Sequence, residues 1–122
     1  MNQFSLPADD SPPATVTQLD QLLRRQLEAA VSKCFYESCD GVMQSLLISC
    51  EWYLTTTATA LTLVINCPDQ ATNWRVLNHI VQIGSYLEPF ASTARIRVCP
   101  PAEVGTPVEI RVDELDIYQD SP

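Results

Sequence analysis

The sequence predicts an α+β fold with the element order α-β-β-α-β-β, in which two helices cover one face of an antiparallel sheet. Two stretches carry apolar residues at helical spacing, and each is followed by a pair of alternating segments of strand length. The sheet has four strands, or five if the C-terminal segment adds an edge strand. A chain of 122 residues with 46% hydrophobic residues can close one core, so we expect one domain over residues 15–114.

Both ends of the chain are predicted to lie outside this domain. Residues 1–14 have neither the basic start nor the apolar run of a signal peptide, and their prolines and aspartates are typical of a flexible leader. Residues 115–122 are expected to be an acidic tail that docks or forms a short edge strand. Of the net charge of −8, −2 lies in residues 1–13 and −4 in the last ten residues, so the remaining body carries only −2.

The first half of the domain is expected to hold one helix and the first strand. Thr17 followed by Asp20 resembles a capping box, and apolar residues then recur at helical spacing, which predicts a helix over residues 17–33. The Asp-Gly pair at residues 40–41 is typical of a turn. Apolar residues occupy the even positions of residues 45–54, and this period of two predicts a half-buried strand.

The second half of the domain is expected to hold the second strand, a helix and a second hairpin. The odd positions of residues 59–67 form an inward apolar row, so residues 45–67 are expected to fold as an antiparallel hairpin. Asp69 follows a proline that ends this strand, and its carboxylate can cap a second helix that reaches Glu88. Residues 93–99 and 107–113 alternate again, which predicts the second hairpin.

The second hairpin also carries a local resemblance to a known family. The segment reads Ala94-Arg95-Ile96-Arg97-Val98, then Pro100-Pro101, then Gly105-Thr106-Pro107-Val108-Glu109-Ile110-Arg111-Val112-Asp113-Glu114. It resembles the end of a family of small uncharacterised cyanobacterial proteins. The resemblance implies a cytosolic protein and supplies neither an activity nor a site residue. The order of elements resembles that of roadblock-like and secretion-chaperone-like domains, and this likeness favours a dimeric adaptor.

No metal, cofactor or catalytic site is predicted. The pair Cys34 and Cys39 lacks the second closely spaced pair that a structural zinc site uses, and the three glycines are too scattered for a phosphate-binding loop. An odd number of irregularly spaced cysteines suits the reduced thiols of a cytoplasmic protein. No apolar run is long enough to span a bilayer, so no membrane association is expected.

The outward row of the second hairpin is the candidate binding site. It carries Arg95, Arg97 and Arg111, which are three of the seven bases in the chain. If Arg97 faces Glu109, then Arg95 faces Arg111, which is unfavourable unless an anion or a carboxylate joins them; a shift by two residues instead pairs Arg95 with Glu109. The row is therefore either a solvated face with ordinary cross-strand pairs or a surface that receives an acidic segment from a partner or from residues 115–122.

The outward row of the first hairpin is the candidate interface. Leu47, Tyr53 and Val64 are expected to lie there beside the arginines, and a monomer seldom leaves such a mixed surface bare. A second copy or the C-terminal segment would cover it, so we expect a homodimer. Nucleic acid is not an expected partner, because no basic stripe extends beyond the arginines.

These observations favour a small cytosolic interaction or adaptor module without enzymatic activity. The alternative is a small-molecule-binding protein or an enzyme with a pocket between the sheet and the helices. Its pocket would use His79, the only histidine, together with Tyr86 and an exposed cysteine, for which Cys34 and Cys39 are the candidates.

Overall fold

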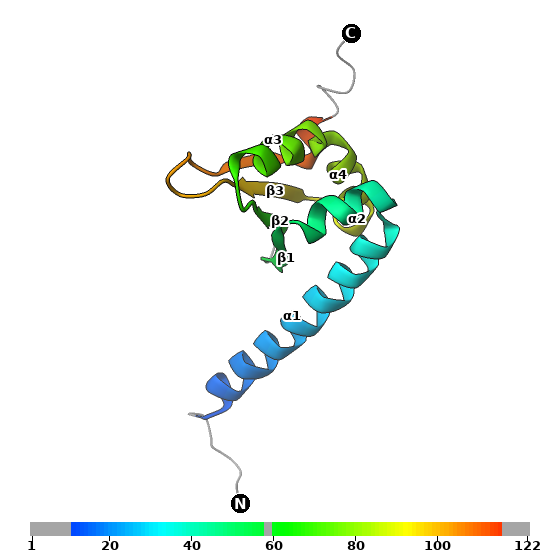
Figure 1. Cartoon of the computed structure of the whole chain (residues 1–122). Helices are drawn as coiled ribbons and strands as arrows, with labels where there is room; N and C mark the ends of the chain where they lie inside the picture. Colours follow the sequence, from blue (N-terminus) through cyan, green and yellow to red (C-terminus); the bar gives the residue numbers. More distant parts are fainter. Residues whose placement is uncertain (1–10, 58–59, 116–122) are drawn as a thin grey trace, which may run out of the picture.

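The structure is a computed structural model that describes residues 11–57 and 60–115, with side chains from residue 17 onward. Its elements are α1 (Ser11–Ser38), α2 (Gly41–Ile48), β1 (Glu51–Thr56), β2 (Leu61–Asn66), α3 (Gln70–Asn78), α4 (Ile80–Leu87), the 3-10 helix η1 (Glu88–Phe90), β3 (Ala94–Cys99), β4 (Val108–Arg111) and the 3-10 helix η2 (Val112–Glu114). The α+β class is as predicted (Figure 1). Most of the predicted leader and tail lies outside the described residues.

The four strands form one mixed sheet in the order β1-β2-β3-β4. The two hairpins, β1 with β2 and β3 with β4, are antiparallel, whereas β2 and β3 run parallel. The prediction of a wholly antiparallel sheet is therefore wrong. The chain between β2 and β3 contains α3 and α4, and a connection of this length can return to the starting edge and lay the next strand parallel. After β4 the described chain turns into η2 instead of continuing as a strand.

The segment predicted as the first strand is split between a helix and a strand. Residues 41–48 form α2, and only the residues from Glu51 onward are extended. Asp40 caps this helix, because its Oδ1 accepts a hydrogen bond of 2.8 Å from the amide of Met43. Met43, Leu46 and Leu47 are all buried, at the i, i+3 and i+4 spacing of a helix. The sequence Asp-Gly therefore begins a helix here and does not make a hairpin turn.

The second predicted helix is two helices that meet at His79. The Asp69 cap is present, with a hydrogen bond of 2.7 Å from the amide of Thr72 to its Oδ1. His79 has φ −108° and ψ 14°, which ends α3 before α4 begins. The described part of the chain thus has four α-helices where two were predicted, because the second predicted helix is split and α2 replaces the start of the first predicted strand.

The core lies against one face of the sheet. Leu63 and Ile65 of β2 and Ile96 of β3 are completely buried, and they alternate with residues that point to the other face. α4 packs on the buried face: a side chain at Gly84 would lie 3.8 Å from Ile96 and would collide with Leu115 of the chain end. This close approach requires a glycine at position 84.

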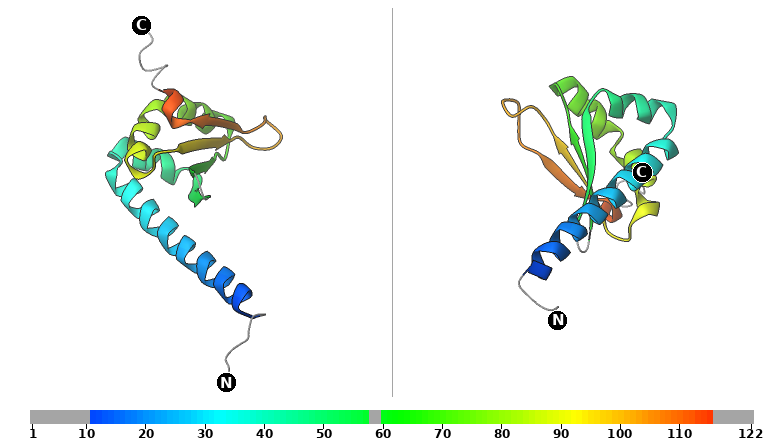
Figure 2. Two further views of the ribbon diagram at one scale, coloured as in Figure 1. Left: turned by 180° about the vertical axis from the view of Figure 1, so that it is seen from behind. Right: turned by 90° about the horizontal axis from the view of Figure 1, so that it is seen from below.

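The long helix α1 joins the core only through its C-terminal part. Phe35 is fully buried and makes an edge-to-face contact with Trp52 of β1, at 5.7 Å between ring centroids. Further towards the N-terminus, the Glu28 carboxylate accepts hydrogen bonds from the amide and the hydroxyl of Thr56, at 2.7 and 3.1 Å. Before Glu28 the helix extends away from the body (Figures 1 and 2), and every residue in 17–27 is exposed.

Candidate functional site: an arginine cluster on the sheet

The three predicted arginines lie together on neighbouring strands. Arg97 of β3 faces Glu109 of β4, and Arg95 faces Arg111, which is the first of the two registers considered from the sequence. The alternation of β3 explains the grouping, because Ala94, Ile96 and Val98 are buried while the arginines between them reach the opposite face. We call Arg95, Arg97, Arg111 and Glu109 the arginine cluster.

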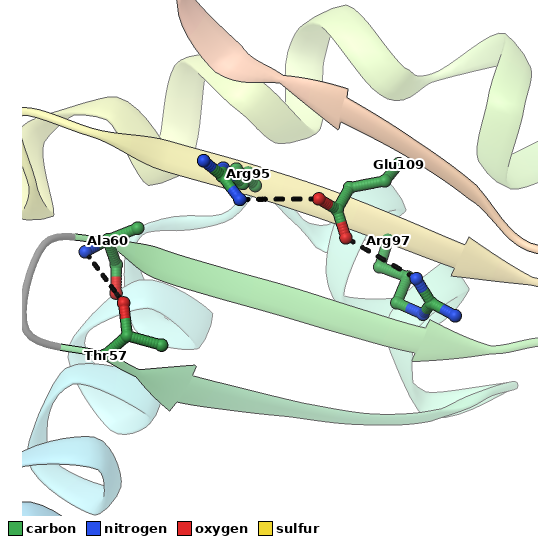
Figure 3. Close-up of polar contacts among 5 residues, drawn as sticks. All are labelled: Thr57, Ala60, Arg95, Arg97 and Glu109. Carbon is green, nitrogen blue, oxygen red and sulfur yellow. Dashed lines mark hydrogen bonds and ion pairs between the residues drawn. The ribbon is translucent and has the colours of Figure 1, made fainter.

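One carboxylate serves two guanidinium groups in the arginine cluster. Glu109 lies between them, with its Oε2 3.6 Å from Nη1 of Arg95 and its Oε1 3.5 Å from Nη1 of Arg97 (Figure 3). The three side chains are 42–45% exposed, and long ion pairs in such a solvated setting contribute little stability. These ion pairs can therefore rearrange at little cost when another carboxylate arrives.

The third arginine has its own partner. Arg111 donates a hydrogen bond of 2.7 Å from Nη2 to the Asp113 carboxylate, and this bond raises the pKa of Arg111. The cluster and Asp113 together hold three positive and two negative charges. Arg95 is the least satisfied member, because its Nε is shielded from solvent and has no hydrogen-bond partner. The cluster is thus left with an unused donor on Arg95.

The two rows of the sheet that contain the arginines differ in chemistry. The first row runs across the four strands through Thr55, Thr62, Arg95 and Arg111. The second row runs across the same strands through Tyr53, Val64, Arg97 and Glu109. Tyr53 is 52% exposed, whereas Val64 is only 6% exposed. The face therefore offers guanidinium groups at one edge and a tyrosine ring at the other.

Leu47 does not belong to this face. It lies in α2 and is 1% exposed, so the structure places this candidate interface residue in the core. Its position was derived from the predicted strand 45–54, and the helix α2 replaces the part of that strand that contained it. Tyr53 and Val64 come from the parts of the hairpin that are extended, and both lie on the expected face.

The thiols differ in exposure more than the sequence indicated. Cys34 is exposed as expected, but Cys39 is 6% exposed and its Sγ donates to the carbonyl of Phe35. Burial, followed by the nearby Asp40 carboxylate, raises the pKa of the Cys39 thiol to about 11. Burial also raises the pKa of Cys67 to about 12. The expectation that Cys39 is exposed is therefore wrong.

The sequence named His79 and Tyr86 for a pocket between the sheet and the helices. His79 lies between α3 and α4, and Tyr86 lies in α4. The Nδ1 of His79 lies 2.8 Å from the Arg75 carbonyl at the junction of α3 and α4. Partial desolvation and then the Asp40 carboxylate raise the pKa of Tyr86.

A groove of about 500 Å³ lies elsewhere, between α1 and the end of the sheet where β1 ends and β2 begins. Neither His79, Tyr86 nor any cysteine lines it. Sequence reasoning missed this groove. The only signal for it was the apolar residues at helical spacing in the first helix, which was expected to cover the sheet.

Comparisons with known proteins return no match: no family model, no curated protein and no solved structure is similar enough to this chain. Among residues 11–57 and 60–115, no helix combines the length and apolar character needed to cross a membrane. The same residues contain no group of three or more histidine, cysteine and acidic side chains placed to hold a metal ion.

Proposed function

We propose that this protein is a small cytosolic interaction module whose arginine cluster binds an acidic segment of a protein partner. One observation carries the proposal: Arg95 faces Arg111 on adjacent strands, and its carboxylate partner, Glu109, is shared with Arg97 while Arg111 is paired with Asp113. Facing like charges are unfavourable unless an anion joins them, and guanidinium groups bind carboxylates in a paired geometry. An incoming carboxylate would bind the exposed end of the Arg95 guanidinium and relieve this repulsion.

We infer that the helices cover only the opposite face of the sheet and leave this one open to a partner. The inference is supported by the exposure of Tyr53 and Arg97 and by the packing of α4 against Ile96 on the other side. The tyrosine ring would contact an apolar part of the bound segment, while the arginines hold its carboxylates. Such a segment would alternate acidic residues with one or two apolar residues.

The chain's own acidic end is proposed as a competitor for the same surface. Asp116 and Asp120 lie in the segment that follows Leu115, outside the described residues. Leu115 is buried, so the chain leaves the body close to η2, which directly follows β4. A short acidic segment attached at this point has a high effective concentration near the arginine cluster.

Cytosolic placement is supported by the state of the thiols. All five cysteines are free, which suits a reducing compartment. The partner is proposed to be a protein and not a nucleic acid, because no basic stripe extends beyond the arginine cluster to follow a phosphate backbone.

Binding of a fluorescent decaglutamate peptide, followed by fluorescence anisotropy at low salt, tests the proposal. The variant Arg95→Gln/Arg111→Gln should bind the peptide about tenfold more weakly or worse, since it removes both facing guanidinium groups. The matched control is Lys33→Gln/Arg75→Gln, which makes the same change in net charge at exposed positions of α1 and α3. The control should stay within about twofold of the wild type.

Two further variants refine the test. Glu109→Gln should tighten binding, because it removes the carboxylate that competes for Arg95 and Arg97. A chain that ends at Leu115 should also bind more tightly if the tail competes, and an unchanged affinity would reject the competition alone. Equal weakening by the Arg95/Arg111 variant and the control would show that only net charge matters, and the proposed site would be wrong.

A further inference from the structure

The N-terminal half of α1 carries a stripe of exposed leucines. Leu19, Leu22, Leu23 and Leu27 are 54, 53, 55 and 55% exposed, and their spacing places them on one side of the helix. We call these four residues the leucine stripe. The described part of the molecule has no comparable group of large apolar side chains within one helix. Contiguous exposed apolar surface of this kind usually marks an interaction site.

The position of the leucine stripe on the molecule indicates that it is covered from outside. All residues in 17–27 are exposed, and Figures 1 and 2 show this part of α1 extending away from the sheet and the other helices. Isolated helices of this length are marginal in water, and helices in proteins gain most of their stability from packing an apolar face. No element among residues 11–57 and 60–115 covers this half of α1, so its packing partner lies outside them.

A groove continues the leucine stripe towards the body. It has a volume of about 500 Å³ and is lined on the helix side by Leu23, Leu27 and Val31. Leu61 at the start of β2 and Phe90 of η1 line the opposite side. The groove has apolar walls next to the exposed leucines. A helix that packs along the leucine stripe could therefore bury apolar side chains in the groove.

We propose that a second copy of this chain covers the leucine stripe, with the two α1 helices packed antiparallel about a two-fold axis that passes between Leu22 and Leu23. In this arrangement Leu22 faces the partner's Leu23, and the two copies of Leu22 lie close together beside the axis. Leu19 would pack beside the partner's Leu27, and the end of each helix would approach the groove of the other protomer.

The charges beside the stripe select the antiparallel arrangement. Asp20 lies close to one end of the stripe, and Arg24 and Arg25 follow it along the helix. Asp20 and Arg24 lie on the same flank of the stripe, so antiparallel packing places Asp20 of each helix beside the partner's Arg24. Parallel packing would instead bring Arg24 on one flank beside the partner's Arg25 on the other. The ion pair of 3.2 Å between Arg24 and Asp20 within one helix is exposed and can be shared across the contact.

This surface differs from the one expected for a dimer from the sequence. On the open face of the sheet, Leu47 is absent and Val64 is 6% exposed, which leaves Tyr53 as its large exposed apolar side chain among the described residues. The leucine stripe supplies four such side chains. The helical contact also leaves the arginine cluster free, so self-association and peptide binding use separate surfaces.

Sedimentation velocity of the full chain over a range of concentrations tests the proposal. We expect a dimer that dissociates in the micromolar range, and the variant Leu22→Gln/Leu23→Gln should raise the dissociation constant by about 30-fold or more. Glutamine keeps the helix propensity, and circular dichroism checks that α1 remains folded. The matched control is Val42→Gln/Ile48→Gln, which replaces two apolar residues of α2 that are 63 and 69% exposed and should leave the dimer intact.

Cross-linking then tests the orientation. In a Cys34→Ser background, Leu22→Cys should form an intermolecular disulfide on mild oxidation, because antiparallel packing brings the two introduced thiols together. The native Cys34 is exposed on the same helix and should not cross-link, whereas parallel packing would join it to its own copy.

A monomer at all concentrations, an unchanged dissociation constant in the stripe variant, or cross-linking through Cys34 would overturn the proposal. Decaglutamate binding by the stripe variant should persist, so this proposal and the arginine cluster can fail independently.

Discussion

At the scale of single residues, the thiols give the clearest contrast. Cys34 is exposed, whereas Cys39 and Cys67 are buried and their pKa values are raised to about 11 and about 12. The thiolate is the reactive form, so a raised pKa and burial both slow alkylation. A brief pulse of iodoacetamide at about pH 8, read by mass spectrometry, should label Cys34 first and leave Cys39 and Cys67 unlabelled until the chain unfolds.

The direction of the pH effect follows from the same shifts. A thiol with a raised pKa favours the folded state while it is protonated, and this contribution is lost as the pH rises from 9.0 towards 11. Stability should therefore fall in strongly alkaline solution. Labelling of Cys39 as fast as Cys34 at about pH 8 would contradict the buried position of Cys39.

Several residue positions followed from the sequence, and the exceptions have different origins. The arginines, Tyr53 and Val64 were placed on the correct face, because strand alternation fixes the face of each side chain once the strand is identified. Leu47 was misplaced because α2 replaces the part of the predicted strand that contained it, and Cys39 was expected to be exposed beside a turn where Asp40 instead caps α2. The leucines of residues 19–27 lie in a helix as predicted, but they are exposed instead of covering the sheet.

At the scale of elements, one carboxylate adds to the aromatic contacts that attach α1 to the sheet. Glu28 accepts two hydrogen bonds from Thr56 at the end of β1. Glu28→Ala would leave that amide without its acceptor, so we expect a loss of about 1–3 kcal/mol in the free energy of unfolding. Urea denaturation followed by circular dichroism measures it. Glu37→Ala, an exposed position on the same helix, is the control and should change stability by less than about 0.5 kcal/mol. Equal losses in both variants would show that the Thr56 contact is unimportant.

Two features of the fold that the sequence did not predict have different physical causes. In residues 45–54 the apolar residues fit a period of two, but Met43, Leu46 and Leu47 also fit a helix, and short apolar runs do not separate these cases. The decisive local signal was Asp40, whose carboxylate can cap a helix as readily as it can begin a turn. The parallel pairing of β2 with β3 depends on the path of the connecting helices, which local pattern does not encode.

At the scale of the whole molecule, the chain separates into a compact body and a projecting helix. The body closes its core without the N-terminal half of α1, and the leucine stripe remains outside it (Figure 1). The arginine cluster lies on the sheet, at a different surface from the groove beside α1. This division permits a molecule that associates with itself through one element and with an acidic partner through another.

If the two α1 helices pack on each other, the thermal stability of the protein must depend on its concentration. A ligand or subunit that binds only the folded state raises the unfolding temperature by mass action. A tenfold increase in protein concentration should therefore raise Tm by a few degrees, as measured by differential scanning calorimetry. Leu22→Gln/Leu23→Gln should abolish this dependence, and Val42→Gln/Ile48→Gln should retain it. A wild-type Tm that is constant over a hundredfold range of concentration would mean that α1 is stable without a partner, and the leucine stripe would then have no role in self-association.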